Sequence, residues 1–146
     1  MDDIELQLQE SIDAKKALLS ANLDIIRKIA DTVVNAFRNN HRIYLIGNGG
    51  SAADAQHIAG ELIGRFKMNR RPLPAVALTT DTSVITALAN DFGYDTCFAR
   101  QVEALADRGD VILAFSTSGN SKGILDAVKV ARDRGAITIG FTGKDG

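Results

Sequence analysis

The clearest evidence on the fold is an apolar run that leads directly into a glycine-rich polar loop, Ile43-Tyr44-Leu45-Ile46-Gly47-Asn48-Gly49-Gly50-Ser51. A second unit of the same kind follows later in the chain, Val111-Ile112-Leu113-Ala114-Phe115-Ser116-Thr117-Ser118-Gly119-Asn120-Ser121. In each unit a short run typical of a buried strand is followed by the loop and then by a helical pattern. In a parallel sheet both loops would lie at the carboxyl edge, where ligands bind and helix N-termini point at them.

Apolar runs and helical patterns alternate from residue 42 onward. We expect strands at 42–46, 75–78, 111–115 and 136–141, and helices at 51–66, at 83–106 with a break near Gly93, and at 121–134. This alternation is typical of βαβ units and predicts an α/β fold: a parallel sheet with helices on both faces, in a three-layer α-β-α sandwich. The crossover connections should be right-handed.

The first part of the chain, residues 1–38, has a helical pattern in two pieces. Apolar residues recur there in a firm stripe (Leu23, Ile26, Val33, Phe37) and a looser one before it (Ile4, Leu8, Ile12, Leu19). Such stripes are buried either against the domain's own sheet or against another subunit; we favour the second and predict an oligomerisation segment. Residues 39–146 then form the ligand-binding domain. We expect that domain to be C-terminally incomplete, because 141–146 read as a strand end and a turn that usually precede another helix.

Composition narrows the class of protein. The chain has 146 residues, enough for one domain with a sizeable core, and its net charge of -1 favours neither nucleic acid nor an anionic membrane as a partner. No apolar run approaches the length that spans a bilayer, and the acidic start does not resemble a signal peptide. The single cysteine, Cys97, fits a reducing compartment. We therefore expect a cytoplasmic protein.

The first loop allows two interpretations. Gly47, Gly49 and Ala52 formally satisfy the dinucleotide fingerprint, but the acidic residue that should follow about 20 positions later is missing, since Asp81 comes late and within a polar loop. Ser51 offers a hydroxyl at the start of the helix, which suits a sugar or a phosphate. The plainer alternative is a glycine turn that caps a helix.

The second loop is more specific for an anion. Ser116, Thr117 and Ser118 supply three hydroxyls before Gly119, and Ser121 stands at the helix N-cap position. A phosphate needs that density of donors together with the positive end of a helix dipole. No lysine lies within the loop, so it is not a Walker-type nucleotide site. The plainer alternative is a serine-rich turn.

Two further pairs are candidates for chemistry. His57 and Glu61 lie four residues apart on one helical face, where an imidazole and a carboxylate could chelate a metal, share a proton transfer or form only a hydrogen-bonded pair. Asn90 and Asp91 end the helix before Gly93, where they either cap the helix or recognise hydroxyls.

Together these stretches resemble the sugar isomerase (SIS) domain family, and within it the phosphoheptose isomerases. The resemblance rests on Gly47–Ser51, His57–Phe66, Asn90–Gly93 and Ser116–Ser121, which occur in the family's order across nearly the whole chain. It implies a flavodoxin-like SIS fold that isomerises sedoheptulose 7-phosphate to D-glycero-D-manno-heptose 7-phosphate, for lipopolysaccharide or another surface glycan. It also implies a homotetramer built around the N-terminal helices, with active sites at subunit interfaces.

The resemblance also implies roles for individual residues. The phosphate would be held by Ser116, Thr117, Ser118 and Ser121, and the sugar would be contacted by Asn48, Gly49, Gly50, Asn90 and Asp91, with Ser51 and Glu61 also binding substrate. Glu61 matches the family's catalytic glutamate. His57 and Glu61 match half of a zinc site, one ion per subunit, whose other ligands lie on a later helix that this chain lacks.

Three other function classes stay open at this point. A SIS-fold binding protein without catalysis, such as those that associate with the bacterial replication initiator, shares both loops but lacks a glutamate at the position of Glu61. A sugar-phosphate sensor would be fused to a DNA-binding module, and no basic or helix-turn-helix segment precedes residue 42. A dinucleotide-binding enzyme would need the missing acidic residue.

Overall fold

The computed structural model describes residues 2–143, and the chain divides into two compact units, one ending at Val34 and one starting at Asn35. The first unit consists of helix α1 (Asp3–Ala21) and most of helix α2 (Leu23–Arg38). Asp2 and Glu5 form a capping box that starts α1, and Asn22 is the C-cap residue that follows its last residue, Ala21. The prediction of a helical segment in two pieces is therefore confirmed.

The apolar stripe of α1 is exposed in the single chain. Ile4 is 71% exposed, Leu8 61% and Leu19 64%, and no residue of α1 is buried. By contrast, Ala36 and Phe37 at the end of α2 belong to the second unit and are buried there. Among the helices within residues 2–143, none has the length and apolar character needed to cross a bilayer.

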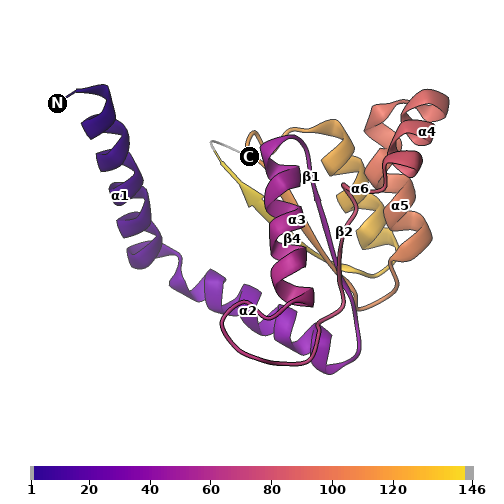
Figure 1. Ribbon diagram of the computed structural model, residues 1–146, viewed down its shortest axis with the longest axis horizontal. Helices are drawn as coiled ribbons and strands as arrows, with labels where there is room; N and C mark the ends of the chain where they lie inside the picture. Colours follow the sequence, from indigo (N-terminus) through magenta and orange to yellow (C-terminus); the bar gives the residue numbers. More distant parts are fainter. Residues whose placement is uncertain (1, 144–146) are drawn as a thin grey trace. The chain divides into compact units, whose positions relative to one another are not determined.

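The second unit is built on a four-stranded parallel sheet (Figure 1). Its strands are β1 (Ile43–Gly47), β2 (Ala75–Ala77), β3 (Val111–Ser116) and β4 (Ile137–Thr142), in the order β2-β1-β3-β4. This order is flavodoxin-like. The chain adds β2 on one side of β1 and then β3 and β4 on the other, so the order of strand addition reverses between β1 and β3 while all four strands stay parallel. Gly47 pairs with Phe115, so the two polar loops leave the sheet side by side at the point where such folds bind ligands.

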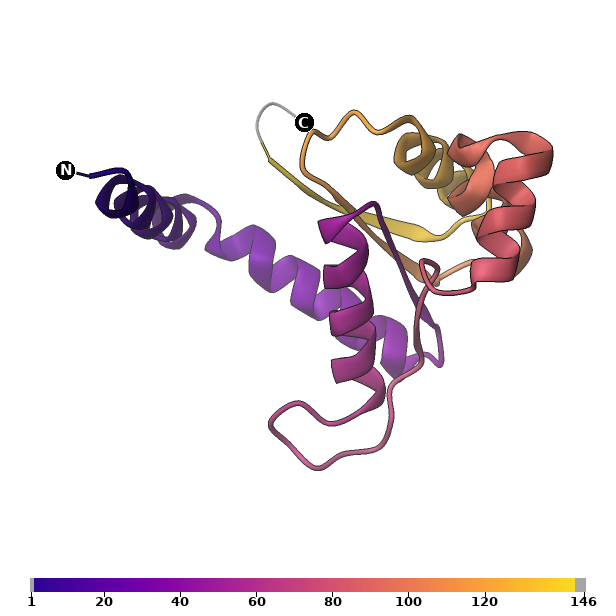
Figure 2. The same ribbon diagram turned by 45° about the horizontal axis from the view of Figure 1, so that its top comes forward.

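Helices cover both faces of the sheet (Figure 2). α3 (Gly50–Ile63) packs on one face, against β1, β2 and β3. α5 (Cys97–Leu105) and α6 (Lys122–Asp133) pack on the other, preceded by α4 (Thr82–Phe92) and a 3₁₀ turn, η1 (Tyr94–Thr96). Gly93 separates α4 from η1 with φ 91°, which confirms the expected break. The predicted three-layer architecture is confirmed, with strand ends within one residue of those expected.

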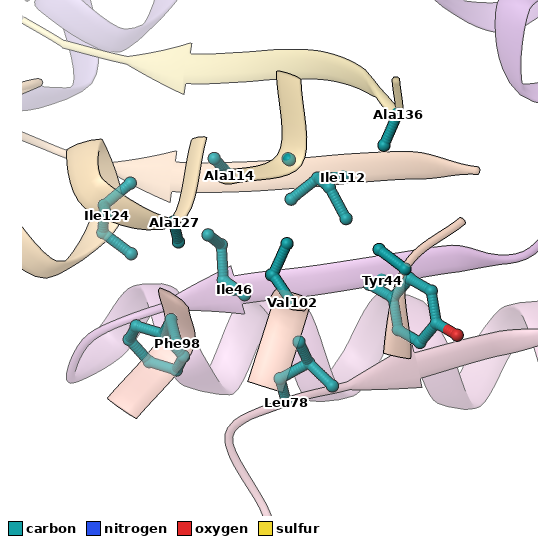
Figure 3. Close-up of a cluster of buried hydrophobic side chains, with 12 residues drawn as sticks. Tyr44, Ile46, Leu78, Phe98, Val102, Ile112, Ala114, Ile124, Ala127 and Ala136 are labelled. Carbon is teal, nitrogen blue, oxygen red and sulfur yellow. The ribbon is translucent and has the colours of Figure 1, made fainter. Parts of the chain in front are cut away.

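The core between the sheet and α5 and α6 is made largely of small and branched side chains (Figure 3). Ile46 and Ile112 extend from neighbouring strands toward Val102 of α5 and Ala127 of α6, and all four are fully buried. Alanines on α6 let the helix approach the sheet closely. The Tyr44 hydroxyl reaches the edge of this core and donates to the Leu105 carbonyl at 2.9 Å.

A buried carboxylate fixes the end of the sheet away from the polar loops. Asp110 is 3% exposed, and its two oxygens accept hydrogen bonds from the backbone amides of Arg42 at 2.8 Å and Asp107 at 2.9 Å. Nδ1 of His41 lies 3.7 Å from Oδ1 of Asp110. His41 therefore belongs to a structural contact at the opposite edge from the loops.

Candidate active site

The two polar loops enclose a hollow of about 270 Å³ at the carboxyl edge of β1 and β3. We call it the loop hollow; it is lined by Asn48, Ser51, Phe115, Ser116, Thr117, Ser118 and Ser121. All the polar residues in this set are sequence candidates, and the structure brings them together. Phe115 was expected only as a strand residue; its ring stacks on Phe141 of β4, with the ring centroids 4.9 Å apart.

Both helices that point at the loop hollow begin without a side-chain cap. The N-cap of α3 is Gly49, and Ser51 lies within the helix rather than at the cap. The N-cap of α6 is Ser121, as expected, but its side chain makes no hydrogen bond to the first turn. Uncapped N-termini leave amide N–H groups and positive partial charge for a ligand. Anion binding therefore explains this arrangement better than the plain capping turn that was the alternative for each loop.

Close approach requires glycine at one position of the first loop. A Cβ on Gly47 would lie 2.6 Å from the backbone oxygen of Ser51, so the turn from β1 into α3 leaves no room for a side chain. In the second loop, Gly119 has φ 69°. The carbonyl of Thr117 accepts a hydrogen bond from the amide of Gly143 at 3.1 Å, which ties this loop to the chain after β4.

One side chain links the two loops. Nδ2 of Asn48 donates to Oγ of Ser121 at 3.1 Å. Oδ1 of the same amide accepts from the Tyr94 hydroxyl at 2.9 Å. Tyr94 was not among the residues predicted from the sequence; its only signal was its position directly after the helix break at Gly93.

The cation closest in sequence to the loop hollow is already paired. Nζ of Lys122 lies 2.9 Å from Asp126 and 3.7 Å from Asp95. The hydrogen bond and charge of Asp126 raise the pKa of Lys122. Within residues 2–143 no lysine or arginine lines the loop hollow, so neutral hydroxyl and amide donors would have to hold an anion there.

His57 and Glu61 lie in a different hollow, of about 470 Å³, which we call the α3 hollow. Nε2 of His57 and Oε1 of Glu61 are 3.8 Å apart, and the side chains are 75% and 38% exposed. Arg70 closes the end of α3 by donating to the carbonyls of Glu61 at 2.8 Å and Leu62 at 2.7 Å. This contact fixes the turn of helix that carries the carboxylate.

The single chain does not bring the two sets of candidates into one hollow. Glu61 follows Ser51 by ten residues on α3, which is about 15 Å along the helix and roughly a quarter turn round it. Asn90 and Asp91 lie exposed at the end of α4, where the Asn90 amide donates to the Asp91 carboxylate at 2.7 Å. Neither residue lines the loop hollow or the α3 hollow.

The His57–Glu61 pair is compatible with zinc. A tetrahedral ion about 2.0–2.2 Å from its N and O ligands requires those ligand atoms roughly 3.4 Å apart. The observed 3.8 Å needs only a small side-chain movement. Within residues 2–143 no group of three or more His, Cys, Asp or Glu side chains could hold a metal. By themselves, His57 and Glu61 could supply only part of the ligand set of a tetrahedral zinc ion.

Comparison with known proteins identifies the family. A family model described as the SIS domain matches residues 8–143. The phosphoheptose isomerase of Geobacter metallireducens is 51% identical over 145 residues, covering 99% of this chain and 77% of that protein. The chain belongs to the phosphoheptose isomerases. The member from Aquifex aeolicus is 50% identical over 146 residues, with 76% of that protein covered.

Solved phosphoheptose isomerase structures agree with this assignment. That from Francisella tularensis superposes with a TM-score of 0.95 at 39% identity, covering 99% of this chain and 76% of that one. That from Neisseria gonorrhoeae gives a TM-score of 0.91 at 43% identity, covering 98% and 74%. The SIS-fold resemblance is confirmed, and the matches favour phosphoheptose isomerases over the binding protein, the sensor and the dinucleotide enzyme that the sequence left open.

Proposed function

We propose that the protein interconverts sedoheptulose 7-phosphate and D-glycero-D-manno-heptose 7-phosphate, a step toward heptose precursors for lipopolysaccharide or another surface glycan. The observation that carries this proposal is the loop hollow, in which two uncapped helix N-termini and a cluster of hydroxyls converge. It occurs in a chain about half identical to proteins named for this activity.

In this proposal the loop hollow holds the phosphate. Hydroxyls of Ser116, Thr117, Ser118 and Ser121 donate to its oxygens, and the N-terminus of α6 adds its dipole. Asn48, Gly49, Gly50 and Ser51 contact the sugar chain, as do Asn90 and Asp91. Binding the phosphate far from carbons 1 and 2 positions those carbons for reaction.

Glu61 then acts as the base. Its carboxylate takes a proton from carbon 1 of the open-chain ketose while the oxygen on carbon 2 gains one, which gives an enediol. A proton is returned to carbon 2, and the hydroxyl on carbon 1 loses its proton as the aldehyde forms. Atoms and electrons balance without an external oxidant or reductant. A positioned carboxylate of this kind contributes about 10²–10⁴ in rate.

We further propose that His57 and Glu61 hold a zinc ion with ligands from outside residues 2–143. When bound, zinc supplies Lewis-acid polarisation of a substrate oxygen. The 3.8 Å separation of the two ligand atoms supports this assignment. Mass-spectrometric metal analysis provides a test independent of activity: His57→Ala should lose bound zinc, whereas His41→Ala should retain it. Equal zinc in both variants would refute the assignment.

The separation of the two hollows supports an active site shared between subunits, in a homotetramer. An extended heptose phosphate spans about 10 Å from phosphorus to carbon 1, at roughly 1.2 Å per bond as in an extended backbone. Glu61 of the same chain lies about 15 Å along α3 from Ser51 of the loop hollow. It also faces another hollow. The exposed stripe of α1 gives a second copy an apolar surface to bury.

Turnover of sedoheptulose 7-phosphate tests the function directly. Glu61→Gln keeps the size of the side chain and removes the base, so the rate should fall by at least about 100-fold. Glu103→Gln is the matched control, because Glu103 is exposed on α5 and lines neither hollow. Wild-type rates in Glu61→Gln would refute the proposed role of Glu61, and a wild-type protein without turnover would refute the function.

A mixing experiment tests the shared site. Glu61→Gln and Ser118→Glu, which places a carboxylate in the loop hollow and repels the phosphate, should each be nearly inactive. Mixed oligomers would contain sites that draw an intact loop from one subunit and an intact Glu61 from another. After unfolding and joint refolding, about a quarter of the wild-type activity should return if subunits mix at random in a symmetric assembly. A mixture no more active than its parts would place both residues in one chain's site.

A further inference from the structure

We propose that Tyr94 is a positioning residue for the anion site. Its hydroxyl orients the Asn48 amide, and that amide in turn leaves the Ser121 hydroxyl free to donate to a phosphate oxygen. The inference rests on the proposed function for the identity of the ligand, and it concerns only how the phosphate is held.

The three groups form a continuous chain of hydrogen bonds. The Tyr94 hydroxyl lies 2.9 Å from Oδ1 of Asn48, and Nδ2 of Asn48 lies 3.1 Å from Oγ of Ser121. Tyr94 belongs to η1, Asn48 to the loop after β1, and Ser121 to the start of α6. The chain of bonds therefore connects both polar loops to a third segment that does not itself line the loop hollow.

The direction of the bonds follows from the chemistry of the phenol. A phenol hydroxyl is a better hydrogen-bond donor than acceptor, because a lone pair of its oxygen is delocalised into the aromatic ring. Its proton therefore selects the amide orientation in which Oδ1 faces Tyr94 and the NH₂ group faces Ser121. Oγ of Ser121 then accepts, and its own proton stays available. In the reversed orientation the Asn48 oxygen would compete for that proton.

Ser121 is free to act in this way. Its hydroxyl does not cap α6, and the residue lines the loop hollow. Successive bonds from Tyr94 through Asn48 to Ser121 also polarise one another, which strengthens the last donor in the series. A neutral site without a lining lysine or arginine depends on such donors for affinity.

The turn that carries Tyr94 is itself fixed against α6. A Cβ on Gly123 would lie 3.1 Å from the backbone oxygen of Asp95, so η1 and the first turn of α6 are in close contact. Asp95 also lies 3.7 Å from Lys122. Tyr94 as a whole is 54% exposed. Removing its hydroxyl should therefore affect the loop hollow and hardly affect folding.

The two tyrosines of the chain provide a matched comparison. Affinity for inorganic phosphate is measured by phosphorus NMR titration, and KM and kcat are measured with sedoheptulose 7-phosphate. Tyr94→Phe should weaken phosphate binding and raise KM by about 3- to 10-fold, the size expected for one hydrogen bond, with kcat within about twofold. Tyr44→Phe loses a hydroxyl bonded to a distant carbonyl and should leave phosphate affinity unchanged.

A double-mutant cycle separates positioning from a general structural effect. If Tyr94 acts through Ser121, adding Tyr94→Phe to Ser121→Ala should change phosphate affinity by less than about twofold. The inference would be overturned if Tyr94→Phe bound phosphate with wild-type affinity. It would also be overturned if Tyr94→Phe weakened phosphate binding as much in the Ser121→Ala background as in the wild type. Lack of turnover by the wild-type protein would refute the proposed function alone, since the phosphate titrations do not depend on it. A wild-type protein that binds no phosphate would overturn both.

Discussion

Replacing Gly47 with alanine should destabilise the protein and weaken anion binding together. The added Cβ would lie 2.6 Å from the backbone oxygen of Ser51 and 2.7 Å from its carbonyl carbon. These are backbone atoms in the first turn of α3, so no side-chain rotation can make room. The turn between β1 and α3 must open, which moves the N-terminus of α3 away from the loop hollow.

The expected magnitude follows from two opposing effects. Overpacking against backbone belongs at the upper part of its usual range, about 3 kcal/mol. The lower freedom of alanine in the unfolded chain returns about 0.5–1 kcal/mol. The net loss of about 2 kcal/mol should lower Tm by roughly 6–8 °C for a domain of this size.

Gly60→Ala is the control, because it makes the same chemical change within α3, the helix whose first turn Gly47 approaches. A Cβ on Gly60 meets no atom within 4 Å apart from its chain neighbours and the backbone of its own helix. Alanine there should stabilise the helix by about 0.5–1 kcal/mol and raise Tm by about 2–3 °C. Both variants are compared with wild type by thermal unfolding at one protein concentration, and phosphate affinity is measured for Gly47→Ala.

The geometry requires Tm to fall in Gly47→Ala and to rise in Gly60→Ala. If Gly47→Ala unfolds at the wild-type temperature, the close approach to Ser51 does not exist in solution. If it is destabilised but binds phosphate normally, the position of the α3 N-terminus does not contribute to the anion site.

Asp110→Ala should lower the free energy of unfolding in urea by about 2–3 kcal/mol, because it deprives two part-buried backbone amides of a charged acceptor. Asp107→Ala, with a side chain 73% exposed, should change it by less than about 0.5 kcal/mol. Burial raises the pKa of Tyr44 above its ordinary value of 10.0, so its contribution to stability is complete below about pH 10 and is lost as pH rises through the folded pKa. Between pH 9.5 and 11, the free energy of unfolding of Tyr44→Phe should therefore fall less than that of the wild type, and the difference should be about 1 kcal/mol or less. Parallel plots of the free energy of unfolding against pH for the two proteins would contradict this. Arg70→Ala should speed chymotryptic cleavage within 64–74, because the carbonyls at the end of α3 lose their donor, whereas Arg71→Ala should cleave at the wild-type rate.

Much of the fold could be predicted because it depends on local patterns. Strand and helix positions follow from the alternation of apolar runs and helical spacing, and the break at Gly93 follows from a residue that tolerates positive φ. The grouping of the two serine-containing loops follows from parallel topology alone, since every strand carboxyl end lies at one edge of the sheet.

What could not be predicted depends on side-chain direction. N-cap spacing predicted Ser121 as a cap, but its hydroxyl accepts from Asn48 instead. Tyr94 lies 46 residues from its partner Asn48, and no pattern in one sequence connects them. Likewise, the helical spacing that pairs His57 with Glu61 does not reveal that both face a different hollow from Ser51.

Pairing Lys122 with two aspartates has a consequence for turnover. The phosphate ester is chemically the same before and after an aldose–ketose exchange, so attraction to it favours neither direction and, if too strong, delays departure of either sugar. In the proposed site, uncharged donors would make that attraction moderate and less sensitive to ionic strength than a lysine or arginine would. Either heptose phosphate would then be released readily from the proposed site.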